Sequence, residues 1–409
     1  MIRIIFPLTL IVVLSVMTIT PTAKAAPAYA RQTNMACMAC HFQSYPALNA
    51  FGRNFKANGY TMMGSQLKIE GVQWLSLPAT LNAGVVTKIR YQESNGPKVD
   101  GTHNTNNGQL QFPDELILIV GGRVSENIGA QLELNLAAKD AEPTAANFKM
   151  PFIYDVSGVK TGAIPFTTAD QGVAYGFELL NTGAVRGARI MEARKSFSAQ
   201  QYIGTATAAE GIALVASNAN YFANVSKWSP RSIGAAKSGS PTATYFRLAF
   251  TPRVGNWDTG FGLQSWSGSA TDPTLADNKT EAYAVDAQAQ GVIGERPFGF
   301  YLTYANANAS AAGNSPNLFN ANVNAKTATT AAGQLGVIPD KATLLLALRK
   351  GDNGQATQNG DDSVTVGATF QVAQNVQLQL NHEMYSGSAY DGTPANGNKF
   401  TTLMLFAAF

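Results

Sequence analysis

The sequence predicts an all-β membrane protein, an antiparallel barrel of about sixteen strands that follows a small α-helical segment. Segments of about ten residues with alternating apolar and polar side chains recur from about Leu77 to the chain end, as in transmembrane barrels. The connections between these segments are alternately short and long. The small segment is predicted from its cysteines. The two cysteines of the 409-residue chain, Cys37 and Cys40, both belong to it and lie three positions apart.

The composition narrows the class of protein. Charged residues make up 13% of the chain, against roughly 25% in an average soluble domain. Hydrophobic residues make up 45%, which excludes an intrinsically disordered chain. The net charge is +3 without a dense basic run, so we expect no nucleic acid among the partners.

Residues 1–25 are predicted to form a signal peptide. Arg3 supplies the positive start, residues 4–19 the apolar stretch, and Ala23-Lys24-Ala25 a small-x-small cleavage site; cleavage after Ala30 is the alternative. The apolar stretch is shorter than the roughly 18–20 residues that a spanning helix needs. We therefore expect export from the cytoplasm into an oxidising compartment rather than anchoring by a helix.

The cysteines belong to a Cys-x-x-Cys-His pattern, which is the attachment signature of a c-type haem. The thiols of Cys37 and Cys40 add to the two porphyrin vinyl groups, and the next residue, His41, becomes the proximal iron ligand. A redox disulfide would need a thioredoxin-like βαβ context, and a zinc site would need two further ligands, whereas His103 and His382 are distant. The sequence therefore predicts one covalently bound haem c.

Two methionines are candidates for the distal iron ligand. Met62 and Met63 follow His41 in a Gly- and Thr-containing stretch that suits a loop over the iron, and a Met/His pair raises the haem potential. Alternatively, both methionines pack on the porphyrin or on the barrel wall. His103 is a more remote candidate.

A short helix is predicted between the attachment motif and these methionines. Leu48, Phe51 and Phe55 recur at helical spacing, and we expect them to pack against the haem. Arg53 and Lys56 either neutralise haem propionates or lie on a solvated helix face.

The barrel is predicted from the rest of the chain. The clearest alternating segments are residues 128–136, 298–304, 363–372 and 376–381. Their polar sets are rich in Gln, Asn, Thr and Gly, which favours a hydrated lumen over the core of a soluble sandwich. The last segment ends in Phe409 and resembles the C-terminal signal of bacterial outer-membrane proteins. His382 continues an apolar, lipid-directed face and is therefore a poor ligand candidate.

Connection lengths support about sixteen strands, with fourteen and eighteen as alternatives. Residues 159–201 do not fit the count, and Leu179 to Ala193 is predicted as a helical piece in an extracellular loop. Several aromatic residues are predicted at strand ends, in interfacial girdles: Trp228, Trp257, Trp266, Tyr245, Tyr283 and Tyr385.

Three regions follow from these observations: the signal peptide, a monohaem domain over residues 26–70, and a porin-like barrel over residues 71–409. A segment of roughly forty residues is near the lower limit for independent folding. A barrel of this size encloses a lumen wide enough for a plug. We therefore expect the haem segment to lie inside the lumen, as an electron conduit.

The stretches 26–33, 37–41 and 42–53 resemble the fused monohaem cytochrome–porin family of iron-oxidising bacteria. The resemblance is tight over about forty residues and only architectural over the barrel. It implies an outer-membrane oxidoreductase that takes electrons from extracellular Fe(II) and passes them to a periplasmic cytochrome c or another soluble carrier. The family's haem residues carry over to Cys37, Cys40 and His41.

Iron oxidation of this kind needs no catalytic acid or base. The loop carboxylates Asp100, Asp277 and Asp391 either attract Fe(II) weakly or are ordinary solvated charges. Three other functions remain open: an extracellular electron conduit with a non-iron donor or acceptor, a passive solute porin with a structural haem, and a periplasmic β-rich cytochrome.

Overall fold

The computed structural model describes residues 28–73, 75–96, 106–138, 144–183, 191, 198–230, 239–271, 277–310, 316–392 and 397–409. The predicted signal peptide, Asp100 and His103 lie outside the described residues.

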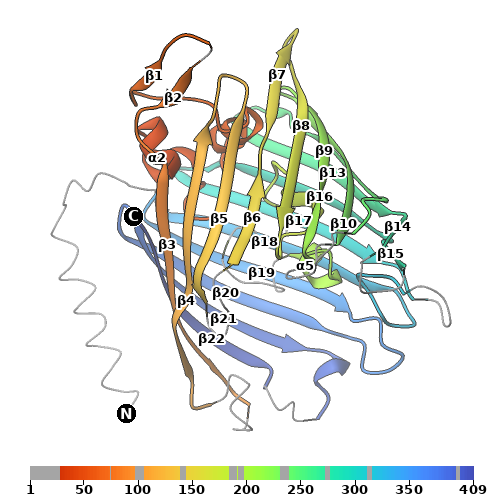
Figure 1. Ribbon diagram of the computed structural model, residues 1–409. Coiled ribbons are helices and arrows are strands. Elements are labelled where there is room, and N and C mark those ends of the chain that lie inside the picture. The colour runs from red at the N-terminus through yellow and green to blue at the C-terminus, as the bar shows by residue number, and fades with distance from the viewer. Residues whose placement is uncertain are drawn as a thin grey trace.

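Antiparallel strands close into one barrel, in which β22 pairs with β3 (Figure 1). In chain order the barrel strands are β3 (Ala83–Ser94), β4 (Gln109–Arg123), β5 (Gly129–Ala138), β6 (Thr144–Lys149), β7 (Phe152–Val156), β8 (Val159–Thr168), β9 (Ala209–Ser217), β10 (Tyr221–Pro230), β11 (Ala243–Phe250), β12 (Arg253–Val254), β13 (Trp257–Ser267), β16 (Ala282–Ile293), β17 (Arg296–Ala307), β18 (Lys326–Ile338), β19 (Ala342–Asp352), β20 (Asp362–Ala373), β21 (Val376–Ser386) and β22 (Lys399–Ala408). Because β6 and β7 both pair with β8, and β11 and β12 both pair with β13, the described residues make sixteen strands around the barrel. The predicted fold class is confirmed.

The remaining elements are short. The helices are α2 (Ala28–Thr33), α3 (Cys37–Cys40), α4 (Ala50–Ala57) and α5 (Ala199–Ile203), with 3-10 turns η1 (Val173–Tyr175) and η2 (Ser388–Tyr390). Two small hairpins join β1 (Lys68–Glu70) to β2 (Ser76–Pro78) and β14 (Ser269–Ala270) to β15 (Asn278–Lys279). No helix in the described part of the chain is long and apolar enough to cross a membrane.

The outer surface of the barrel is apolar. On β19, Leu344 and Leu346 are each 50% exposed, whereas Leu345 between them is 4% exposed because it faces inward. Inward-facing side chains on other strands are mostly polar and buried, among them Gln264, Gln288, Thr365 and Gln377. A closed sheet satisfies all its backbone hydrogen bonds internally, and an apolar exterior removes the cost of contact with lipid. The barrel is therefore a membrane-spanning one.

A charge on this outer surface is expected to destabilise the barrel. Leu346 lies near the middle of β19, so Leu346→Arg should cost about 2–4 kcal/mol, the range for a charge at the bilayer midplane. Urea titration in lipid vesicles, with heat-modifiable gel mobility as the readout, measures the loss. The same replacement of Ile338, beside a turn, should cost under about 1 kcal/mol. Equal losses at both positions would contradict the membrane placement.

The connections alternate as predicted. Short turns lie at one barrel end, for example between β4 and β5, between β18 and β19 and between β20 and β21. We call this the short-turn end; the β7–β8 hairpin projects from it (Figure 1). Longer connections lie at the other end, which we call the long-loop end, as between β17 and β18.

Four of the predicted girdle aromatics are placed wrongly. Trp228, Tyr245 and Trp266 are buried inside the barrel, and Phe319 packs against both tryptophan rings, at 6.3 and 6.2 Å between ring centroids. The reason is strand parity: each shares its face with buried polar residues such as Asn224 or Gln264. Tyr385 also faces inward.

The other two girdle aromatics lie on the outer surface. Trp257 faces outward and packs against Gly291, and Tyr283 is exposed beside Tyr304. Interfacial aromatic residues are thus present at both ends of the barrel, as predicted.

The segment that did not fit the strand count enters the barrel. We call residues 169–208, between β8 and β9, the lumen insertion; 169–183, 191 and 198–208 are described. The predicted helix in an extracellular loop is wrong for residues 179–183, which are non-helical and buried. Except for Met191, the rest of that prediction lies outside the described residues.

Candidate functional site

The attachment motif forms a compact turn. Cys37 and Cys40 begin and end α3, and the backbone N–H of His41 donates to the Cys37 carbonyl at 3.0 Å. A spacing of three in a helical turn places both thiols on one side. Both cysteines are free and half-buried, and burial raises the pKa of the Cys40 thiol to about 11. The two sulfur atoms are thus presented together, as protonated thiols.

The His41 ring is oriented for metal binding. Its Nδ1 lies 3.2 Å from the Ala47 carbonyl and 3.3 Å from the Pro46 carbonyl. Carbonyl oxygens only accept, so Nδ1 carries the proton and the lone pair stays on Nε2. Metal-ligating histidines typically donate their other ring N–H to such an acceptor. Burial also lowers the pKa of His41, which favours the neutral form of the imidazole.

Asn49 joins the motif to the next helix. Its Oδ1 accepts from the Gly52 N–H at 2.9 Å and caps α4. Its Nδ2 donates to the Ala39 carbonyl at 2.9 Å, inside the attachment turn. Sequence reasoning missed this residue, although an asparagine directly before a helical apolar pattern is a recognisable N-cap signal.

Close approach of α3 and α4 requires a glycine at position 52. A Cβ atom there would lie 2.2 Å from the Cys40 carbonyl oxygen. Because the atoms that a methyl group would meet belong to the Cys40 backbone, the methyl group cannot be accommodated without moving the attachment turn. Gly52, like Asn49, was not among the predicted site residues.

Gly52→Ala is therefore expected to reduce haem attachment severalfold while leaving the barrel folded. Haem staining of the denatured protein, normalised to protein amount, measures attachment, and heat-modifiable mobility reports the barrel. Gly333→Ala is the matched control, since a Cβ there meets Phe298 at an ordinary 3.5 Å. Wild-type haem content in the Gly52 variant would show that the described α3–α4 packing is not needed.

The predicted haem-packing residues divide into two groups. Leu48 and Phe51 are half-buried beside the attachment turn. Phe55 is instead buried against Tyr29 and Tyr60, with ring centroids 5.3 and 5.7 Å away. Phe55 thus builds the core that holds α2 against α4.

The described contacts tie the two candidate distal methionines to α2. Gln32 Nε2 donates to the Met62 carbonyl at 2.7 Å, and the Gly64 N–H donates to the Gln32 carbonyl at 3.0 Å. Both Met62 and Met63 are half-buried. His382 faces outward and contacts Thr401, as the strand pattern predicted.

The segment that carries the motif contacts the inner barrel wall at the short-turn end. Gln43 Nε2 donates to Asp340 Oδ1 at 3.1 Å, and the Tyr45 N–H donates to Gln377 Oε1 at 3.2 Å. The Tyr45 ring also stacks on Phe406 at 4.4 Å. Asp340 lies in a short turn, and Gln377 and Phe406 face the lumen.

Arg53 belongs to this contact rather than to a solvated helix face. It is buried, pairs with Asp258, and donates to Gln290 Oε1 at 3.3 Å. Both partners are on barrel strands. The expectation that Arg53 lies on a solvated face is wrong, and its guanidinium is engaged by the wall. Lys56 is half-buried, and burial lowers the pKa of its ammonium group to about 8, so it does not lie on a fully solvated face either.

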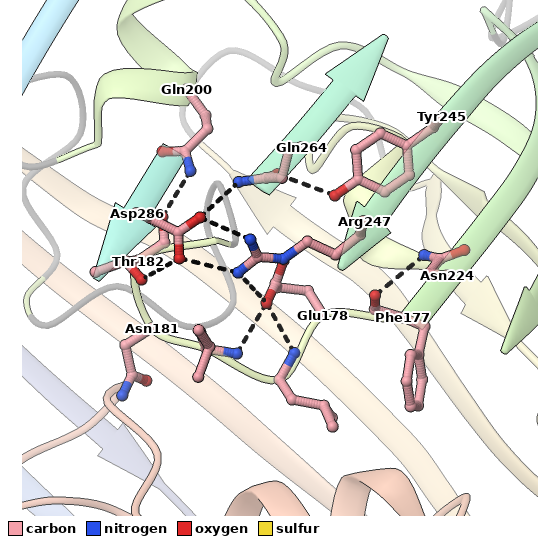
Figure 2. A network of polar contacts seen from close by, with 12 residues as sticks. Phe177, Glu178, Asn181, Thr182, Gln200, Asn224, Tyr245, Arg247, Gln264 and Asp286 are labelled. Atoms are coloured by element: carbon pink, nitrogen blue, oxygen red, sulfur yellow. Dashed lines mark hydrogen bonds and ion pairs between the residues drawn. The ribbon is translucent and has the colours of Figure 1, made fainter. Parts of the chain in front are cut away.

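The lumen insertion is held across the barrel by a buried ion network (Figure 2). Arg247 is 0% exposed; its Nε lies 2.9 Å from Glu178 Oε2, and its Nη1 lies 2.7 Å from Asp286 Oδ2. Glu178 Oε1 also accepts the backbone N–H groups of Leu179 and Leu180. A strand residue of β11 thus bridges the insertion to β16.

This network lies within a dense apolar cluster that fills one side of the lumen. Phe177 and Leu180 of the insertion pack among inward-facing Phe222 and Tyr245. Asn181 links the insertion to the haem segment, because its Oδ1 accepts the Leu48 N–H at 2.8 Å and its Nδ2 donates to the Leu48 carbonyl at 2.9 Å. The motif segment and the insertion therefore form one plug.

Comparison with protein-family models gives no match, and no curated protein matches this chain. Among solved structures, the chain is similar to a triple mutant of the Rhodopseudomonas blastica porin, with 13% identity, 81% of this chain and 100% of that chain covered, and a TM-score of 0.50. It is also similar to the outer membrane channel DcaP of Acinetobacter baumannii, with 10% identity, 80% and 97% coverage, and a TM-score of 0.50. At such identities the likeness concerns the fold, which is that of porin barrels.

Proposed function

We propose that this protein is an outer-membrane monohaem cytochrome that oxidises extracellular Fe(II) and passes the electron to a periplasmic carrier, such as a soluble cytochrome c. One observation carries the proposal. The turn that presents Cys37, Cys40 and His41 is docked inside a membrane-spanning barrel, at one of its two ends. A redox centre in this position can exchange electrons across the barrel without crossing lipid.

The residues of the attachment turn fit a c-type haem. Cys37 and Cys40 would hold it through thioether bonds, and His41 Nε2 would be the proximal ligand, since Nδ1 is engaged by carbonyls. A bound haem supplies a one-electron centre. Within the described residues no group of three or more His, Cys, Asp or Glu side chains is arranged for a bare metal ion.

The two ends of the barrel indicate on which side of the membrane the site lies. Short turns of outer-membrane barrels face the periplasm and long loops face outside. The Cys37 sulfur lies 3.5 Å from Asn375 Oδ1 in the short turn between β20 and β21. A soluble carrier would therefore approach at the short-turn end, and Fe(II) would approach from the long-loop end.

The state of the lumen favours electron transfer over passive solute transport. A porin keeps a continuous aqueous channel. Here the insertion places Phe177, Leu180 and the Arg247 network inside the barrel. A passive porin with a structural haem remains compatible with the fold.

Stopped-flow spectroscopy tests the proposed donor. When purified oxidised protein is mixed with anaerobic Fe(II) at neutral pH, the Soret and α bands of the reduced haem should appear during the stopped-flow time course. Dithionite reduction provides the reference spectrum. If dithionite reduces the haem and Fe(II) does not, iron oxidation is wrong and a non-iron donor takes its place.

The distal ligand is tested separately. We propose Met62 or Met63, and Leu replaces each in turn. One of the two variants should lose the near-infrared Met–Fe(III) band and have a lower potential, because a thioether ligand raises it. Unchanged spectra in both variants would refute the methionine assignment and leave the proposed function standing.

A further inference from the structure

Another group of polar side chains lines the lumen on β20 and β21, toward the long-loop end. Glu383 and Tyr385 face inward, and their cross-strand partners on β20 are Thr365 and Ser363. Directly opposed residues in an antiparallel pair have Cβ atoms about 4.5–5.5 Å apart. The four side chains therefore form one inward-facing group.

Three buried oxygen atoms on this inner face, one of them on the neighbouring Asn381, lack hydrogen-bond partners among the described residues. Thr365 is 0% exposed, Asn381 is 1% exposed and Ser363 is 3% exposed. Within the described part of the chain, Thr365 Oγ1, Asn381 Oδ1 and Ser363 Oγ accept and donate no hydrogen bond. Buried polar atoms in native proteins nearly always have a hydrogen-bond partner, so such a set indicates a ligand or ordered water.

A glycine leaves room for one of these oxygens. Gly367 is the cross-strand partner of Asn381, and a Cβ at Gly367 would lie 2.8 Å from Asn381 Oδ1. Asn381 and Glu383 lie on the same face of β21, two residues apart. The amide oxygen is thus accommodated on the face that carries the carboxylate.

The carboxylate of Glu383 lacks its own cation. The guanidinium groups whose charge acts on Glu383 are those of Arg349 and Arg90. Arg349 pairs with Asp361, and Arg90 pairs with Asp114 at 2.8 Å. Glu383 itself accepts a hydrogen bond from the Tyr385 hydroxyl and forms no ion pair among the described residues. The formal charges of these three carboxylates and two guanidinium groups add up to one net negative charge: Glu383, Asp361, Asp114, Arg349 and Arg90.

We propose that Glu383 and Thr365 bind a hydrated divalent cation in the lumen, with Asn381 and Ser363 on either side of them accepting hydrogen bonds from its water ligands. A carboxylate, a hydroxyl and water are hard oxygen ligands, which suit Mg²⁺, Mn²⁺ and Fe²⁺. With a single carboxylate the site is weak and its ion exchanges readily. The described residues hold no group of three or more His, Cys, Asp or Glu side chains that could hold a metal ion, and this site rests on a single carboxylate.

The site lies between the long loops and the haem segment. Gln377, on the same face of β21, contacts Tyr45 of that segment. Glu383 is six residues further toward the long-loop end, roughly 20 Å along the strand at about 3.3 Å per residue. An Fe(II) ion held here would lie between the long loops and the plug. A role of the site in iron oxidation rests on the proposed function, whereas cation binding itself does not.

Mn²⁺ titration tests the site, since bound Mn²⁺ loses its sharp solution EPR signal. The purified haem-containing protein in detergent should bind about one Mn²⁺ ion. Glu383→Gln should weaken binding at least tenfold, and Thr365→Val severalfold. Asp391→Asn, an exposed carboxylate at the same end, is the matched control and should bind as the wild type does.

The outcomes separate the two proposals. Absence of stoichiometric Mn²⁺ binding, or equal binding by the wild type and a folded Glu383→Gln variant, overturns the site. Heat-modifiable mobility establishes that each variant is folded. Glu383-dependent Mn²⁺ binding supports the site even where Fe(II) fails to reduce the haem, and that failure counts against the proposed function alone.

Discussion

Replacing both Cys37 and Cys40 with Ser is expected to abolish covalent haem and Fe(II) oxidation while leaving a folded barrel. Serine hydroxyls do not add to the porphyrin vinyl groups, and His41 alone would hold the haem by one bond. The barrel should persist because its closure depends on strand pairing and not on α3, which adds only a few wall contacts such as that of Cys37 with Asn375. Haem staining after denaturation should fall below a few percent of the wild-type signal.

Met38→Leu is the control for that experiment. Met38 lies between the two cysteines and keeps the turn apolar when replaced by leucine. Its haem stain should match the wild type. Retention of covalent haem by the double serine variant would show that Cys37 and Cys40 are not the attachment residues, and the proposed function would lose its basis.

Arg247→Leu is expected to release the lumen insertion and open the barrel to ions. The substitution removes the cation that pairs with buried Glu178 and Asp286 among the described residues. Breaking a buried ion pair in this way costs about 3–5 kcal/mol. The thermal midpoint should therefore fall, and planar-bilayer conductance should rise severalfold.

Arg253→Leu controls for loss of one positive charge. Arg253 is exposed in β12, beside a short turn, and its replacement should change neither conductance nor the thermal midpoint. If Arg247→Leu conducts no better than the wild type, the ion network does not hold the insertion in place. A wild-type conductance as high as that of an open porin would contradict the filled lumen itself.

The barrel was predictable because its signal is local. Alternation such as that of Leu344, Leu345 and Leu346 follows directly from the two-residue period of a strand. Which face points to lipid is harder to assign when both faces carry aromatic residues. Trp228 and Trp266 therefore looked like girdle residues, although their neighbours Ser226 and Gln264 mark the inner face.

The lumen insertion was not predictable from local pattern. Glu178 and its partner Arg247 are 69 residues apart, and Arg247 and Asp286 are 39 apart. Each looks like an ordinary charged residue until the barrel brings them together. Instead of entering the predicted helix, the backbone N–H groups of Leu179 and Leu180 donate to the Glu178 carboxylate.

The Cys-x-x-Cys-His pattern was recognisable in the sequence because its spacing is local, and its haem stays a prediction. The support of this pattern was not predicted, since Asn49 and Gly52 act through backbone atoms of the same turn. The role of Arg53 depended on Asp258, 205 residues away. Residues that dock one region onto another are visible only once both regions are placed.

Electron transfer across a sealed membrane tests the central claim most directly. Proteoliposomes would hold oxidised soluble cytochrome c and an Fe(II)-specific colour-forming chelator inside, with anaerobic Fe(II) added outside. We predict reduction of the trapped cytochrome with little chelator colour, and no reduction with the double serine variant of Cys37 and Cys40. A trapped cytochrome that stays oxidised, or a chelator that colours as fast as the cytochrome is reduced, would contradict the account.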